Sequence, residues 1–191
     1  MDRRELLKMI VVATGAAMVG LPARGHGQVP AAGAKTLFSD AEVGTLDEIA
    51  ETILPRTKTP GARDAGAGLF MAQFVTDCYT VRQQATFRAG LADIDKRAGG
   101  RFVSLAPQAR TELLRTLDAG ARKHAVEVTE TGTAEQGEAM PHYFTMIKQL
   151  TIFGFFTSKV GATEVLQYVA VPGRYDGDLA YVPGTPAWGT S

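Results

Sequence analysis

Few residues of this chain could carry metal, haem or nucleophilic chemistry. Cys78 is the single cysteine, so the chain cannot form an internal disulfide, a zinc cluster or a C-x-x-C-H haem attachment. The three histidines, His26, His124 and His142, lie far apart in the sequence, and none has the spacing of a metal-ligand pair. We therefore expect neither a metal site nor a haem in this chain.

Cys78 and His142 have ordinary structural interpretations. Cys78 falls on the apolar stripe of a predicted helix, where a small buried thiol is the usual finding. The alternative is a disulfide to another subunit, which an oxidising compartment permits. His142 stands at a predicted helix start, where we expect a surface or capping residue, and the other interpretation is a histidine that reaches a partner's active site.

The common catalytic and cofactor motifs are absent from the sequence. The run Gly66-Ala67-Gly68-Leu69-Phe70-Met71 starts like G-x-G-x-x-G, but it lacks the third glycine and follows a proline-containing loop rather than a strand. There is no G-x-S-x-G, P-loop or H-E-x-x-H pattern. The sequence therefore predicts no catalytic site and no bound cofactor in this chain.

The charge balance narrows the class of partner. The chain has 191 residues with 20 Lys and Arg against 20 Asp and Glu, so it has no basic field for nucleic acid or for an anionic membrane surface. We expect no nucleic-acid partner. The length and the ordinary globular composition predict one domain.

The first 27 residues have the pattern of an export signal. Arg3, Arg4, Leu6, Leu7 and Lys8 precede a short apolar run, which is too short to span a bilayer and ends at a proline. Adjacent arginines before Leu-Leu-Lys are typical of the twin-arginine (Tat) signal, so the Tat translocase and the periplasm are predicted. The other interpretation is a general secretory signal with two incidental arginines.

The export route has a consequence for the partner. Twin-arginine export moves folded proteins and is favoured by cargoes that load a cofactor before export. This chain has no cofactor motif, so the signal is best explained by a partner that travels bound to it. Any membrane association would come through that complex.

The remaining sequence predicts an all-α fold. Residues 28–38 form a flexible lead, and residues 39–167 form one compact helical domain of about five helices. Ser39 and Glu42 have the spacing of a capping box at the first helix. The Gly99-Gly100 pair ends the third helix, and Pro107 begins the fourth. The loop of residues 55–68 is expected to be a rigid, extended connector or a surface lid.

The fifth helix, which begins near Pro141, is apolar all round in its second half. One stripe holds Tyr143, Met146, Ile147, Leu150 and Phe153, while Ile152, Phe155 and Phe156 fall on the opposite side. Such a helix is either the central helix of the domain or a helix shared with a partner. We select Phe155 and Phe156 as partner-interface residues.

Residues 168–191 are predicted to form an extended, irregular C-terminal arm. The segment is rich in proline, glycine and aromatic residues and is low in charge, which is unlike a disordered tail. Tyr168, Arg174, Tyr175 and Trp188 are the side chains expected to anchor an interface. The arm packs either on its own domain or on a partner.

Four segments of the chain resemble the gluconate 2-dehydrogenase subunit 3 family. They are the runs Ile49-Ala50-Glu51-Thr52-Ile53-Leu54-Pro55-Arg56-Thr57-Lys58-Thr59-Pro60-Gly61-Ala62 and Asp77-Cys78-Tyr79, the run Leu150-Thr151-Ile152-Phe153-Gly154-Phe155-Phe156-Thr157-Ser158, and residues 168–177. The proline and glycine spacing of the first run is the most specific. Many relatives read Tyr-Asp-Gly-Cys where this chain has Tyr175, Asp176, Gly177 and Asp178, so the resemblance implies that an intersubunit disulfide at that point is excluded here.

The resemblance also implies a biochemical setting. Members of the family are small subunits of periplasmic dehydrogenases whose catalytic subunit resembles the glucose-methanol-choline (GMC) flavoproteins and binds FAD. A c-type cytochrome subunit with haem c often completes the complex. Gluconate, glucose, fructose, sorbitol or the 3-hydroxyl of glycosides are the implied substrates, and they are oxidised on the partner's FAD.

Three hypotheses for the function follow. The first is a non-catalytic subunit that carries the export signal for the flavoprotein and stabilises it. The second is a dissociable chaperone that releases the flavoprotein in the periplasm. The third, an independent enzyme, lacks any catalytic constellation in the sequence.

Overall fold

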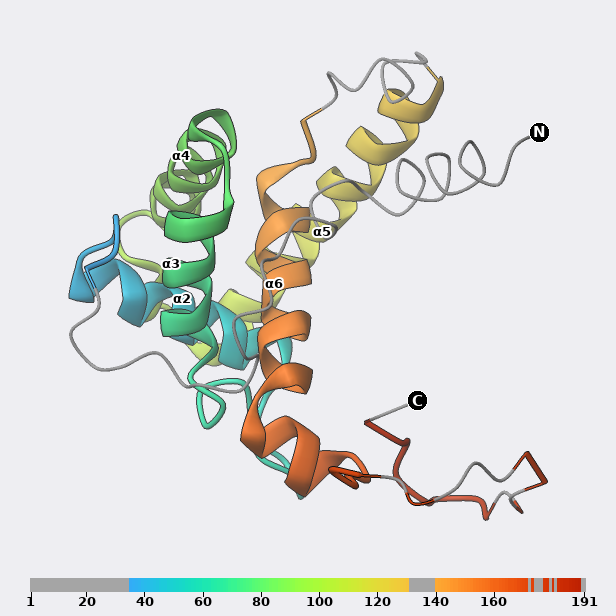
Figure 1. Cartoon of the computed structure of the whole chain (residues 1–191). Coiled ribbons are helices and arrows are strands. Elements are labelled where there is room, and N and C mark those ends of the chain that lie inside the picture. Colours follow the sequence, from blue (N-terminus) through green and yellow to red (C-terminus); the bar gives the residue numbers. More distant parts are fainter. Residues whose placement is uncertain are drawn as a thin grey trace, which may run out of the picture.

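The fold is built from helices, as the hydrophobic periodicity predicted. A computed structural model describes residues 35–130, 140–171, 173, 177, 178, 180 and 182–189. Its elements are α2 (Asp40–Ile53), α3 (Ala67–Cys78), α4 (Val81–Arg97), the 3₁₀ turn η1 (Phe102–Ser104), α5 (Pro107–Glu130), α6 (Tyr143–Thr157) and the π-helical turn η2 (Gly161–Val165) (Figure 1). No strand occurs among the described residues, and the predicted all-α class is confirmed.

Local sequence signals set the helix ends. At α2 the Ser39 hydroxyl accepts the Glu42 N–H at 3.3 Å, and the Glu42 carboxylate accepts the Ser39 N–H at 2.8 Å, so the predicted capping box is confirmed. Thr80 and Gln83 form a second capping box at α4, which the sequence analysis had not noted. Gly99, with φ of 71°, follows the end of α4, and Pro107 is the first residue of α5.

Helix α6 runs through the centre of the domain and contacts α2, α3, α4 and α5. Glycines let its neighbours approach closely. A Cβ on Gly154 of α6 would lie 2.5 Å from the Phe70 ring of α3, and a Cβ on Gly90 of α4 would lie 2.2 Å from the Tyr143 ring of α6. α6, with buried residues from Phe144 to Phe155, therefore forms the central core helix, one of the two roles expected for it.

The core is apolar and draws on every helix. Its largest fully buried apolar side chains are Phe87, Phe102, Leu46, Ile49, Met71, Ile94, Met146, Ile147 and Val75. None of the described helices combines the length and apolar character needed to cross a membrane.

The loop between α2 and α3 is folded back on α2, so the expectation of an extended connector or a lid is wrong. The Glu51 carboxylate accepts the backbone N–H of Arg56 at 2.8 Å and that of Arg63 at 2.9 Å. Ala62 at the middle of the loop is fully buried. Gly61 has no room for a side chain, because a Cβ there would lie 2.4 Å from a Glu51 carboxylate oxygen. Acceptors on the preceding helix therefore fix the loop in place.

Ion pairs complete the attachment of this loop. Glu48 of α2 is paired with Arg63 of the loop and with Arg110 of α5. Arg110 also donates to the Val103 carbonyl at 2.6 Å. Asp47 accepts the Gly68 N–H at 2.9 Å, and burial raises the pKa of this carboxyl although the Gly68 hydrogen bond opposes the shift. Asp47, Glu48 and Glu51 of α2 thus bind the loop, the start of α3 and α5.

Candidate partner interface

The outer face of α6 presents apolar side chains near the helix C-terminus. Ile152 and Phe156 lie one turn apart, and both are exposed, Phe156 by 38%. Phe155 was expected on the same face, and that prediction is wrong: its side chain is only 4% exposed and belongs to the core.

The burial of Phe155 has a local cause. After α6 the chain turns back through η2, so that a Cβ on Gly161 would lie 2.0 Å from the Phe155 carbonyl oxygen. Val165 of η2 packs against the core cluster that includes Phe155. The chain itself packs against this side of α6, and Ile152 and Phe156 are the large apolar side chains of α6 that stay exposed.

The C-terminal segment that follows η2 is joined by hydrogen bonds between its two ends, Gln167 and residues 186–189. Gln167 and Trp188 form an isolated parallel bridge, in which the Gln167 N–H donates to the Ala187 carbonyl and the Gly189 N–H donates to the Gln167 carbonyl, both at 2.8 Å. The Gln167 side chain also donates to the Pro186 carbonyl at 2.8 Å. In Figure 1 the coloured parts of this segment run outward from the end of α6.

Exposure separates the two roles considered for this segment. Every described residue between positions 168 and 189 is exposed, including Tyr168 at 48% and Trp188 at 49%. These residues therefore do not cover the core of their own domain. Arg174 and Tyr175, the other two predicted anchors, lie outside the described residues, as do the export-signal residues Arg3, Arg4, Leu6, Leu7 and Lys8.

Most of the large hydrophobic side chains exposed in the described part of the chain gather at this end. We call them the C-terminal apolar surface, and they are Ile152, Phe156, Tyr168, Val169, Val171, Val182 and Trp188. Exposed apolar side chains mark an interaction site where they form a contiguous patch. Tyrosine and tryptophan are also the residues most enriched at interface hot spots.

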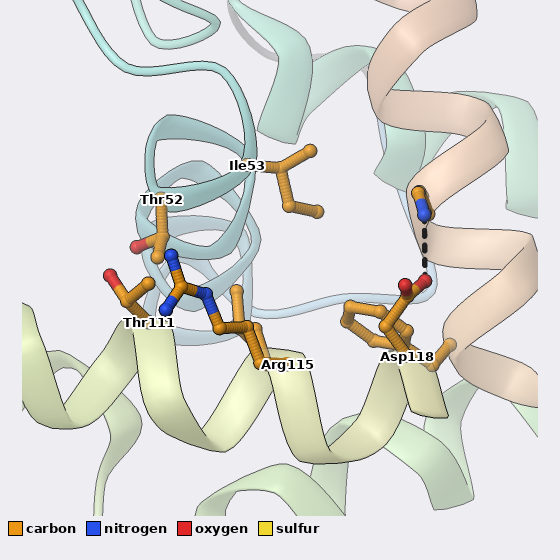
Figure 2. A pocket seen from close by; sticks show the side chains of 8 residues that line it. Thr52, Ile53, Thr111, Arg115 and Asp118 are labelled. Atoms are coloured by element: carbon orange, nitrogen blue, oxygen red, sulfur yellow. Dashed lines mark hydrogen bonds and ion pairs between the residues drawn. The ribbon is translucent and has the colours of Figure 1, made fainter. Parts of the chain in front are cut away.

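An open pocket of about 260 Å³ lies between α2, α5 and α6, where sequence reasoning had placed nothing (Figure 2). Its lining comprises Thr52, Ile53, Thr111, Leu114, Arg115, Asp118, Phe144 and Lys148. The i, i+3 spacing of Arg115 and Asp118 shows that they share a face of α5. The crossing of α6 with α5, which brings Phe144 and Lys148 opposite them, is not encoded in any local pattern.

The charged side chains of the pocket differ in their pairing. Asp118 accepts from Lys148 at 2.6 Å and from Arg122 at 2.6 Å, and these hydrogen bonds, Lys148 first, hold the pKa of Asp118 below its usual range. Figure 2 shows Asp118 turned toward α6 and Arg115 turned toward Thr52 and Thr111. Arg115 forms no hydrogen bond or ion pair with any other described residue.

The other titratable cluster, at the start of α6, has a structural role. His142 caps the helix by accepting the Phe144 N–H at 3.1 Å through Nδ1, which confirms the predicted capping role. Its ring stacks on Tyr143 at 4.4 Å, and the Tyr143 hydroxyl donates to Asp93 at 2.6 Å. That bond lowers the pKa of Asp93, whereas burial lowers the pKa of His142.

Cys78 is exposed, so the predicted buried thiol is wrong. The buried face of α3 is instead formed by Ala67, Gly68, Met71, Ala72 and Val75. Cys78 continues this face at i+3 from Val75, but it is the last residue of the helix and its side chain is exposed there. Partial burial, and to a lesser extent the negative charge of Asp77, raises the pKa of the Cys78 thiol. A raised pKa disfavours the reactive thiolate at neutral pH. Over the residues that the structure places, no three Cys, His, Asp or Glu side chains form a possible metal site.

The described residues form an all-helical domain with large apolar side chains exposed toward its C-terminal end. Residues 40–173 match the sequence model of the family described as gluconate 2-dehydrogenase subunit 3. The match spans most of the chain, which therefore belongs to this family. The family's description is that of a dehydrogenase-complex subunit. No curated protein and no solved structure matched the chain.

Proposed function

We propose that this chain is the non-catalytic small subunit of a periplasmic, FAD-dependent dehydrogenase whose GMC-type catalytic subunit oxidises a sugar or sugar acid. It carries the Tat signal for both subunits and stabilises the flavoprotein by staying bound to it. Family membership supports the dehydrogenase setting.

One observation supports the docking role most strongly. The C-terminal apolar surface leaves tyrosine, tryptophan, phenylalanine and aliphatic side chains exposed, while the core of the domain is already filled without them. Their exposure to water is unfavourable by roughly 25 cal/mol for each Å² of apolar area. A stable interface buries about 800 Å² on each partner, and these seven side chains would be part of it.

The polar groups of the domain give little support to an enzymatic role. The acidic residues of α2 hold the adjacent loop, and His142 caps α6. Tyr143 and Asp93 bond to each other. In this proposal FAD is held by the catalytic subunit, and haem c by a cytochrome subunit where the complex has one.

The test is purification of the complex from the periplasm. An affinity tag inserted after Gln28 lies beyond the predicted export signal of the first 27 residues and far in sequence from the C-terminal apolar surface. We expect the tagged chain to bring down a large flavoprotein in a fixed ratio, with flavin absorbance between about 350 and 500 nm that belongs to the large subunit alone. The same chain expressed without that flavoprotein should be colourless.

Two results would contradict the proposal. A stoichiometric flavin or haem spectrum in the isolated small chain would show that it is not a cofactor-free subunit. Recovery of the chain alone from a periplasm that contains active flavoprotein would instead favour the dissociable chaperone.

A further inference from the structure

The pocket between α2, α5 and α6 carries an excess of positive charge. Its charged lining residues are two cations, Arg115 and Lys148, and one anion, Asp118. Asp118 is paired with Lys148 and also with Arg122, which lies outside the lining, whereas Arg115 has no partner among the described residues. In a chain with equal numbers of acidic and basic residues, this local excess favours an anionic group.

The remaining lining restricts the kind of anion. Ile53, Leu114 and Phe144 supply apolar contacts, and the last two are buried. The hydroxyl of Thr52 donates to the Glu48 carbonyl at 2.7 Å, and that of Thr111 donates to the Pro107 carbonyl at 3.0 Å. Because a hydroxyl has a single proton, neither threonine has one to offer a ligand. A carboxylate beside an apolar side chain suits this lining better than a polyol does.

Along α6 the pocket residue Lys148 lies one helical turn before Ile152 of the C-terminal apolar surface. Lys148 lines the pocket, and Ile152 and Phe156 follow it at four-residue spacing along α6. Residues four apart in a helix are neighbours on its surface. A protein that covers Ile152 and Phe156 therefore has the pocket within one further helical turn.

We propose that this pocket is a second contact with the flavoprotein subunit, in which Arg115 binds a carboxylate of the partner and Ile53, Leu114 and Phe144 receive an adjacent apolar side chain. The inference rests on the proposed function. A guanidinium binds a carboxylate through two parallel N–H donors, which would fix the orientation of the partner as well as its position.

The experiment measures the affinity of the purified subunit for the flavoprotein that co-purifies with it. Arg115→Glu should weaken binding at least about tenfold, because it places like charge against the partner's carboxylate. Arg115→Lys should restore part of the affinity. The matched control is Lys123→Glu, which makes the same charge change at another exposed site of α5 and should leave the affinity unchanged.

Salt and stability separate a charge contact from misfolding. Affinity of the natural chain should fall as salt rises, and Arg115→Glu should flatten that dependence. The melting temperature of the isolated Arg115→Glu subunit should stay at the level of Lys123→Glu, since Arg115 forms no bond within the described chain.

Three outcomes would overturn the inference. Equal flavoprotein affinity of Arg115→Glu and Lys123→Glu would show that Arg115 is outside the interface. Arg115-dependent binding of gluconate to the isolated subunit, with complex formation unaffected, would make the pocket a small-anion site. No binding of flavoprotein by the natural chain would overturn the proposed function, and this inference with it.

Discussion

Two adjacent phenylalanines of α6 should have opposite phenotypes when each is replaced by alanine. Phe155 is 4% exposed and packed in the core, so Phe155→Ala removes buried apolar surface and leaves a cavity. Substitutions of this kind cost about 3 to 5 kcal/mol. For a chain of this size the loss corresponds to a fall in melting temperature of roughly 6 to 20 °C.

Phe156→Ala should affect stability much less. Its side chain is 38% exposed, and its main intramolecular partner is the Phe155 ring, at a centroid distance of 5.0 Å and an interplanar angle of 79°. An edge-to-face pair of this kind contributes about 1 kcal/mol, so the melting temperature should fall by only a few degrees. The affinity for the flavoprotein should instead drop by about 30-fold, which corresponds to the 2 kcal/mol of an interface hot spot.

Thermal melts of the two isolated variants, followed by circular dichroism, give the first comparison, and titration against the flavoprotein gives the second. Similar losses of melting temperature in both variants would show that Phe156 also belongs to the core. Full flavoprotein affinity in a folded Phe156→Ala subunit would remove the outer face of α6 from the interface.

Three further predictions follow from the described contacts. Ending the chain after Gln167 should change the melting temperature of the helical domain by only a few degrees, because the described residues beyond Gln167 are exposed. The same truncation should abolish stable flavoprotein binding. A large fall in melting temperature would instead assign the C-terminal arm to the core. Burial and the nearby His124 lower the pKa of His142 in the folded chain, so the unfolding free energy should be highest above pH 6.5 and fall as the pH drops below that value. His142→Gln should remove this part of the pH dependence of the unfolding free energy. An unchanged pH dependence in the variant would contradict the capping role of His142. Glu48→Gln should reduce the unfolding free energy, measured in urea, by about 2 to 4 kcal/mol, because it leaves the largely buried Arg110 without its charge partner. As a control, Arg56→Ala at the exposed end of the same loop should leave the urea midpoint nearly unchanged.

Local signals in the sequence were sufficient for the helices and their ends. The Ser39 and Glu42 capping box, the Gly99 helix end and the Pro107 helix start each depend on residues within a few positions of one another. The periodicity of apolar residues placed Met146, Ile147 and Leu150 on the core-facing stripe of α6 for the same reason.

The errors at Cys78 and Phe155 have a common physical origin. A helical periodicity gives the relative directions of side chains, but it does not say which sides of a helix other elements will cover. Phe155 is buried where the chain reverses at η2, and Cys78 is exposed because α3 ends there, although Cys78 continues the buried face of that helix. Both facts depend on tertiary packing.

The loop and the pocket required the three-dimensional arrangement. Glu51 and Arg63 are twelve positions apart, and their hydrogen bond depends on how the intervening prolines and glycines fold. Arg115 and Lys148 come from different helices, and their common pocket depends on the crossing of α5 with α6. The resemblance of the Ile49–Ala62 run to the family marked this run as characteristic. Its structural role, in which Glu51 holds the loop against α2, is visible only in the contacts.

The most direct test of the central claim, that this chain exports and holds its flavoprotein, is fractionation of cells carrying Arg3→Lys with Arg4→Lys. The Tat pathway recognises the arginine pair, so the flavoprotein should accumulate in the cytoplasm together with the small subunit and disappear from the periplasm. Arg24→Lys, a matched substitution outside the arginine pair, should leave both subunits in the periplasm. A normal periplasmic level of flavoprotein in the Arg3 and Arg4 double variant, with the small subunit retained inside the cell, would contradict the claim.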